Sequence, residues 1–228
     1  MVCIDAGHGV ETAGKCSPDK SYYEHEFALD MAKRIYDKMT VAGVPAMLTR
    51  QDEHDISLAE RCRIANDAKA DYFISLHSNA SGDDWSNARG RTIYVYKRGY
   101  NAEKLATAID DAMWDCNTRR GIAEGNFAVL RETDMPACLI EFDFHTNKDS
   151  LLNCLKNSAW REKAAEAVKN GVMMMLFGAT FILRDWSDGV VLPAWSPKPI
   201  PHTEWYRQFS FDEAVNLAHF DMTTGKTV

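Results

Sequence analysis

Two histidines and a glutamate stand in the sequence where metal ligands are often found. His8 lies in the glycine-rich turn DAGHG (residues 5–9), directly after an apolar run. Glu24 stands where a helical period begins, and His77 closes the apolar segment 72–77. Two histidines and one carboxylate, with a fourth position left open, form the ligand set of hydrolytic zinc sites. The separations, 8 to 24 and 24 to 77, are long, so spacing alone is weak evidence for such a site.

A fourth residue, Glu141, places a carboxylate inside a segment of core character, CLIEFDF (residues 138–144). Burying a carboxylate for structure alone is costly unless a partner compensates for its charge. A general base that works beside a metal site has a use for such a carboxylate. The alternatives are a glutamate that pairs with a buried arginine, or one that is exposed on an edge strand.

A scaffold of strands and helices must bring these residues together. Short apolar runs predict six strands, at residues 2–7, 44–49, 72–77, 92–96, 128–130 and 137–141. Apolar residues four apart predict helices that begin near Tyr23, at the capping box Ser57–Glu60, near Leu105 and at Ser158 as N-cap. Because strands alternate with helices, we expect a three-layer α/β/α fold around a twisted, largely parallel, mixed sheet of about six strands. Ligands bind at the carboxyl ends of strands in such sheets.

Composition excludes several classes of protein. The 228 residues are 46% hydrophobic and 26% charged, which is typical of a globular protein that can bury a core without disulfides. With a formal net charge of −7 and no dense Lys/Arg run, we expect no nucleic-acid partner. No apolar stretch is long enough to span a bilayer, so we expect no membrane insertion. The six cysteines form no CxxC pair, and we expect reduced thiols.

Seven short motifs follow one another along the chain. They are DAGHG (5–9), an E-x-E-x-x-L-x-x-A helix start (24–32), LTR (48–50), ISL…R…AN (56–66), AD-x-FISLHSNA (70–80), RG (120–121) and PA-x-LIEFDFHTN (136–147). In this order they resemble the zinc-dependent N-acetylmuramoyl-L-alanine amidases of the Amidase_3 family, over about residues 1–177. The resemblance implies hydrolysis of the amide bond between the lactyl group of N-acetylmuramic acid and L-alanine in peptidoglycan, with one Zn²⁺ per chain.

The resemblance also implies a role for each chemistry-bearing residue. It assigns His8, Glu24 and His77 as zinc ligands and Glu141 as the catalytic carboxylate. Glu26 is the alternative to Glu24, which we prefer because the family's ligand opens the helix motif.

Other polar residues near these motifs receive weaker assignments. We expect Asp5 and Asn79 to orient the ligands through hydrogen bonds, although either could instead cap a turn. His145 stands where family members usually carry an apolar residue, and we expect it to face the surface rather than the cleft. We expect the remaining histidines to be solvated, namely His25, His54, His202 and His219.

A change of composition near Gly178 predicts a boundary between two parts. Residues 1–178 form the predicted catalytic domain, and residues 179–228 form a C-terminal extension with four of the seven prolines. A second capping box, Ser210–Glu213, predicts a short helix there. The extension could target the cell wall through aromatic rings that stack on sugars, or pack those rings on the catalytic domain, which we favour.

Two other functions fit the same residues. A zinc peptidase would cut the peptidoglycan stem peptide instead, and a non-catalytic module would only bind the wall, although the presence of all four site residues argues against the latter. The opening residues show neither the basic nor the apolar region of a signal peptide. We therefore expect a protein that is made in the cytoplasm and reaches the wall by holin-type release, like a phage or prophage endolysin rather than an exported autolysin. We also expect a monomer.

Overall fold

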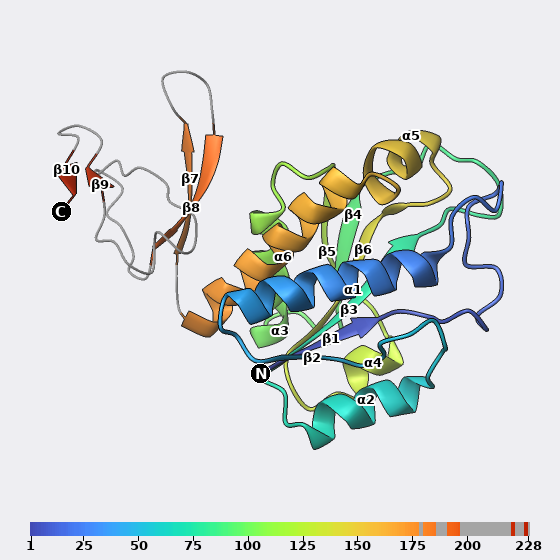
Figure 1. The fold of residues 1–228 in the computed structure, drawn as a ribbon, viewed down its shortest axis with the longest axis horizontal. Helices are drawn as coiled ribbons and strands as arrows, with labels where there is room; N and C mark the ends of the chain where they lie inside the picture. The colour runs from blue at the N-terminus through green and yellow to red at the C-terminus, as the bar shows by residue number, and fades with distance from the viewer. Residues whose placement is uncertain (178–179, 186–190, 197–219, 222–225, 228) are drawn as a thin grey trace.

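Six strands form one central sheet in the computed structural model, which describes residues 1–177, 180–185, 191–196, 220–221 and 226–227. The strands are β1 (Val2–Ala6), β2 (Ala46–Leu48), β3 (Tyr72–Asn79), β4 (Arg91–Val95), β5 (Arg119–Glu124) and β6 (Ala137–Phe144). Their order across the sheet is β2-β1-β3-β6-β4-β5 (Figure 1). All neighbours run parallel except β4 and β6, which are antiparallel. The predicted mixed, largely parallel sheet is confirmed.

Helices cover both faces of this sheet (Figure 1). On one face lie α1 (Glu24–Val41), α3 (Asn101–Ala112) and α6 (Ser158–Phe177), and on the other lie α2 (Leu58–Asp67) and α4 (Ala128–Arg131). Two short elements, α5 (Lys148–Ser150) and η1 (Leu151–Leu155), follow β6. The predicted three-layer α/β/α architecture is therefore confirmed.

Alternate side chains of each strand enter two separate cores. In β6, Ile140 joins the larger core under α1, α3 and α6, whereas Leu139 joins the smaller core under α2 and α4. In β3, Phe73 also belongs to the smaller core. Because the side-chain period of a strand is two, Glu141 and His77 point to the same side as Leu139 and Phe73. The sheet therefore places the side chains of Glu141 and His77 on the face that α2 and α4 cover.

Two elements differ from the sequence-based expectation. The predicted strand 128–130 is the helix α4, whose Val129 and Leu130 complete the smaller core. A three-residue apolar run has no period of its own, so it cannot distinguish a strand from one helical turn. The strand β5 was not predicted, because it is a largely exposed edge strand that begins with two arginines and contains Gly121.

The predicted helix caps are partly confirmed. Ser57 accepts a hydrogen bond from the Glu60 backbone N–H (3.1 Å), as the capping box predicts. At α6 the cap is Asn157 rather than Ser158: the Asn157 side-chain oxygen accepts from the backbone N–H of the third helical residue, Trp160 (3.2 Å). Ser158 is already the first residue of the helix.

Residues 179–228 are described only in part. Two short antiparallel pairs are present, β7 (Thr180–Asp185) with β8 (Val191–Ser196) and β9 (Phe220–Asp221) with β10 (Lys226–Thr227). The predicted helix at Ser210–Glu213, His202 and His219 lie outside the described residues. Among the described helices, none combines the length and hydropathy needed to cross a membrane. All six cysteines are unpaired in this structure.

Candidate active site

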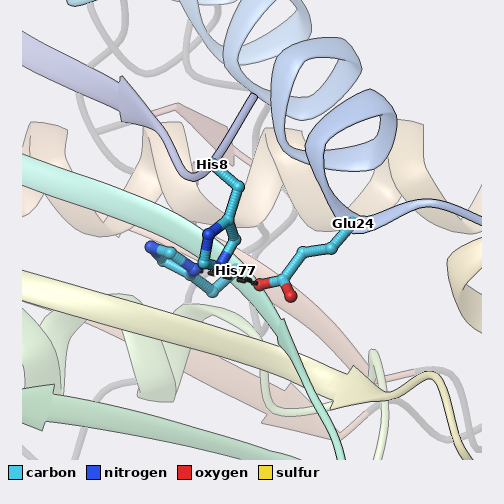
Figure 2. Close-up of side chains that lie close together, drawn as sticks. All are labelled: His8, Glu24 and His77. Atoms are coloured by element: carbon cyan, nitrogen blue, oxygen red, sulfur yellow. Dashed lines mark hydrogen bonds and ion pairs between the residues drawn. The ribbon is translucent and has the colours of Figure 1, made fainter. Parts of the chain in front are cut away.

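Three side chains from separate elements converge at the carboxyl ends of β1 and β3. His8 follows β1, Glu24 opens α1 and His77 lies near the end of β3, and the three point toward one another (Figure 2). Oε1 of Glu24 lies 2.9 Å from Nδ1 of His77 and 3.3 Å from Nε2 of His8. One ligand atom from each residue lies within 4.8 Å of the other two. This group of donors could hold one metal ion.

The turn that carries His8 leaves room for the His77 ring. A β carbon at Gly7 would lie 2.3 Å from Cε1 of His77, so any larger residue at that position would push the ring away. His8 itself has a φ of 58°, which non-glycine residues seldom adopt. The surrounding structure must therefore hold this turn in place.

Two buried arginines hold the turn by its carbonyl groups. Arg61 donates from Nη1 to the Ala6 carbonyl (2.6 Å) and from Nη2 to the His8 carbonyl (3.1 Å). Arg50 donates to the carbonyls of Ala6 (2.9 Å) and Gly7 (3.1 Å). Sequence reasoning placed both arginines in motifs but gave them no role. The sequence offered one sign that the Arg61 side chain is buried, which is its place between apolar positions of a helix.

Asp5 reaches His77 through a serine. The Ser75 hydroxyl donates to Oδ2 of Asp5 (2.6 Å) and lies 3.1 Å from Nε2 of His77. Since a carboxylate only accepts, the Ser75 proton goes to Asp5, and the Ser75 oxygen accepts from Nε2–H of His77. Nδ1, which faces Glu24, is thereby the ring nitrogen available to a metal.

The charge of Asp5 is matched by an arginine. Arg61 donates to Oδ1 of Asp5 at 2.6 Å, and both side chains are fully buried. Although burial opposes it, Arg61 and the Ser75 and Thr49 hydroxyls together hold the pKa of Asp5 below its usual value. Asp5 is therefore ionised and accepts the hydrogen bond of Ser75, the residue that contacts His77.

Glu24 is a buried carboxylate held by the groups around it. It is 2% exposed, and its Oε1 accepts from the Ser78 backbone N–H (3.1 Å). Burial alone would raise the pKa of Glu24, but the facing histidines His77 and His8 hold it well below its usual value. In return Glu24 raises the pKa of His77, against the effect of burial. Glu26 is exposed and lies outside the convergent group, which supports the choice of Glu24.

Glu141 lies beside the three converging residues on the neighbouring strand. It is the register partner of His77 across β3 and β6. Its Oε2 atom is buried and has no hydrogen-bond partner in the described part of the chain, so the alternative of a buried arginine pair is wrong. Burial raises the pKa of Glu141 to about 7, although the nearby His77 opposes this rise. Such a carboxylate can accept and return a proton near neutral pH.

These residues line one cavity of about 530 Å³. His8, Glu24, His77 and Glu141 lie on its wall, and so does Asp5. The rest includes apolar side chains from α2, α4, their flanking segments and β6: Ile56, Leu58, Phe127, Val129 and Leu139. A cavity of this size with a few polar groups and an apolar wall is suited to an organic substrate.

Two histidine predictions are wrong. His145 does not face the surface: it is 2% exposed, lines the cavity and contacts the Ser78 hydroxyl (3.0 Å). His25 is 6% exposed rather than solvated, and its ring packs 5.8 Å from that of Tyr23. His54 is exposed, as predicted.

Asn79 also lies on the cavity wall, but its side chain makes a hydrogen bond elsewhere. Its side-chain oxygen accepts from the backbone N–H of Ala80 (2.8 Å). Within residues 1–177, no hydrogen bond joins Asn79 to His8, Glu24 or His77. Of the two residues expected to orient the ligands, the structure connects only Asp5 to one of them.

The fold and the site define a class of protein. It is an α/β enzyme in which two histidines, one glutamate and an adjacent carboxylate without a hydrogen-bond partner at Oε2 lie together on the central strands of the sheet and the segments next to them. Residues 2–174 match the family model described as N-acetylmuramoyl-L-alanine amidase. The chain belongs to this family, Amidase_3, as its motifs predicted.

Individual relatives agree with this family. The chain is 34% identical over 177 residues to N-acetylmuramoyl-L-alanine amidase LytC of Bacillus subtilis (strain 168), covering 75% of this chain and 34% of LytC. The catalytic domain of CwlV, an N-acetylmuramoyl-L-alanine amidase from Bacillus (Paenibacillus) polymyxa var. colistinus, has a TM-score of 0.70 at 31% identity and covers 77% of this chain and 97% of that domain. An N-acetylmuramoyl-L-alanine amidase from Clostridium difficile 630 has a TM-score of 0.73 at 31% identity, with coverages of 77% and 95%. The chain therefore spans about a third of LytC but matches nearly all of the two solved structures.

Proposed function

We propose that this protein is a zinc-dependent amidase that cleaves the bond between the lactyl group of N-acetylmuramic acid and L-alanine in peptidoglycan. The observation that carries the proposal is the unpartnered Glu141 carboxylate beside the group formed by His8, Glu24 and His77. Membership of the amidase family supports the choice of substrate. Peptidoglycan places the site of action in the cell wall.

The residues present fit a zinc ion. Two imidazole nitrogens and one carboxylate oxygen are the donor types of catalytic zinc sites, which keep one position open for water or substrate. The glycine at position 7 keeps the space that the His77 ring occupies, and the Asp5–Ser75 pair presents its Nδ1 toward Glu24. When bound, Zn²⁺ would polarise the scissile carbonyl and lower the pKa of water at the site.

The chain's own residues would move the proton. Glu141 lies on the strand next to His77 and has a free buried oxygen, so it can accept the proton of the attacking water. As the amide bond breaks, the same carboxyl group returns that proton to the departing amine of L-alanine. In the metal-free protein, burial raises the pKa of Glu141 to about 7, which brings this carboxylate toward the range in which a general base works best.

Metal analysis combined with wall clearing tests this proposal. The purified protein should bind one zinc per chain and reduce the turbidity of a suspension of purified cell walls. A chelator should stop the clearing, and added zinc should restore it. Clearing that continues at the same rate after the zinc has been removed would refute the metal-dependent function.

We also propose that residues 1–178 act as the catalytic unit and that residues 179–228 form a separate extension. The family match ends at residue 174 and α6 ends at Phe177, which supports this boundary. Deletion of residues 179–228 should leave zinc binding and the cleavage of a soluble substrate intact. A wall pull-down with the shortened chain then tests whether the extension targets the wall, and size-exclusion chromatography tests the expected monomer.

A further inference from the structure

His145 is a buried histidine in the cavity that the proposed mechanism does not use. It directly follows β6, four residues after Glu141, and its backbone N–H donates to the Asn79 carbonyl (2.8 Å). Its side chain lies on the wall of the same cavity as His77 and Glu141. Because His145 lies near the groups proposed to react, the hydrogen bonds that its ring can make bear on substrate binding.

A chain of two hydrogen bonds determines which ring nitrogen of His145 carries the proton. The Tyr22 hydroxyl donates to Oγ of Ser78 (2.7 Å), and Oγ of Ser78 lies 3.0 Å from Nδ1 of His145. The Ser78 hydroxyl accepts from Tyr22, so its own single proton points to Nδ1 of His145. Nδ1 is then an acceptor, and in the neutral ring the hydrogen sits on Nε2.

The Nε2–H group has no protein acceptor. The only side-chain hydrogen bond of His145 within the described residues is the one at Nδ1. The His145 ring lines the cavity, and Nε2 is not among the described side-chain atoms that are both fully buried and without a partner. Burial lowers the pKa of His145, although the Glu24 carboxylate opposes this, so the ring is neutral at pH 7.

The donor is rigidly tied to the metal-ligand group. Ser78 contacts His145 with its hydroxyl and donates its backbone N–H to Oε1 of Glu24 (3.1 Å). The Tyr22 ring packs against the His145 ring, with centroids 5.7 Å apart. A donor that is held in place before the substrate arrives loses little entropy on binding.

We propose that His145 is a further substrate-binding residue, whose Nε2–H donates a hydrogen bond to a carbonyl oxygen of the muramoyl-peptide in the cavity. This inference rests on the proposed function. An uncharged carbonyl oxygen is the acceptor that suits the N–H donor of a neutral imidazole. A muramoyl-peptide offers such carbonyls on both sides of the scissile bond.

Three variants test the inference. His145→Leu removes the donor at similar volume, His145→Gln keeps an N–H donor near the position of Nε2, and His54→Gln changes an exposed histidine as the control. The probe is N-acetylmuramoyl-L-alanyl-D-isoglutamine, titrated into zinc-loaded protein that also carries Glu141→Gln so that it is not cleaved. We expect His145→Leu to weaken its binding about 10- to 100-fold at unchanged zinc stoichiometry, since a polar group of the ligand is left unpaired. The variants His145→Gln and His54→Gln should bind within about threefold of the parent.

The tautomer provides a second readout, which tests whether His145 carries the Nε2–H donor that the inference requires. Long-range proton–nitrogen NMR spectra should show a neutral His145 ring protonated at Nε2 at pH 7, and Ser78→Ala should give a mixture of both tautomers. A hydrogen on Nδ1, or His145→Leu protein that binds the probe as tightly as the parent, would overturn the inference.

The two proposals can fail separately. If the zinc-loaded wild-type protein releases no free amine of L-alanine, the proposed function fails, and the binding comparison still decides on His145. If the wild-type protein cleaves and His145→Leu matches it in both binding and kcat/KM, only the inference about His145 fails.

Discussion

His77 and Glu141 lie directly opposite each other on the adjacent parallel strands β3 and β6. Since both strands alternate in the same way, the two side chains reach the same cavity wall. The nitrogen proposed to bind the metal and the carboxylate proposed to transfer the proton are therefore brought together by strand pairing rather than by a loop. Sites built on strands hold their geometry well, which suits proton transfer over a short distance.

This pairing predicts two separable losses of function. Glu141→Gln should lower amidase activity by about 10²- to 10⁴-fold while zinc stays bound, because only the proton acceptor is removed. His77→Ala should lose zinc and activity together. Zinc content per chain and turnover of a soluble muramoyl-L-alanine substrate measure both effects. If Glu141→Gln retains near wild-type turnover, the assigned role of Glu141 is wrong.

The raised pKa of Glu141 predicts a pH-dependent stability of the metal-free protein. Between the usual carboxyl value of 4.5 and about 7, the unfolded chain releases the Glu141 proton and the folded chain keeps it. The free energy of unfolding of the wild type therefore falls as the pH rises through this range. Glu141→Gln removes the contribution of this carboxyl group to the fall. Relative to pH 4.5, the variant should gain on the order of 1–3 kcal/mol over wild type at pH 8.

Urea denaturation of both proteins in chelator, at several pH values, measures this difference. A constant difference between pH 4.5 and 8 would show that the pKa of Glu141 is not raised in the folded protein.

The buried pair of Asp5 and Arg61 predicts a large effect on stability. Asp5→Asn removes the buried one of the two carboxylates that pair with Arg61 and leaves only the partly exposed Asp55, which costs on the order of 3 kcal/mol of unfolding free energy at pH 7. The pKa of Asp5 is lowered, so this contribution is present above its unfolded pKa and is lost as the pH falls through the folded value. Asp67→Asn is the control, because it breaks an exposed pair with Arg63 and should change stability little. Equal effects of the two changes would contradict the account.

The close approach of Gly7 to His77 predicts a loss of metal affinity. Gly7→Ala adds a β carbon 2.3 Å from Cε1 of His77 and should displace the ring, lowering zinc affinity at least tenfold. Gly14→Ala is a matched control: Gly14 has a positive φ but open space around its α carbon, so the variant should lose some stability and keep its zinc affinity. Competition with a chromogenic chelator measures both affinities. Unchanged zinc affinity in Gly7→Ala would argue against this role of Gly7.

The sequence predicted the parts of the site that follow from local patterns. His8 follows one apolar strand and His77 lies near the end of another, so their common location could be inferred from local patterns. The choice of Glu24 over Glu26 depended instead on the resemblance to the family's motif. The sheet type followed from the alternation of strands and helices. The helix α4 was mistaken for a strand because its apolar run is too short to show a period.

Other parts depend on contacts between distant residues, which a single sequence does not display. The surface prediction for His145 relied on the usual exposure of polar side chains. Its burial could not be seen in the sequence, because its partners Ser78 and Tyr22 lie 67 and more than 100 residues away in the chain. The buried position of Arg61 is equally hidden, since Asp5 compensates its charge from 56 residues away. In both cases a polar residue is buried because the tertiary fold supplies its partner.

The most direct test of the proposed function is the identity of the amino groups released from peptidoglycan. Purified peptidoglycan is digested with zinc-loaded protein, and the soluble products are identified by mass spectrometry, with Glu141→Gln as the control digest. We expect free stem peptides that begin with L-alanine, together with glycan strands that retain their lactyl groups, and neither in the control. New amino groups on other stem residues would identify a peptidase and contradict the proposed cleavage site.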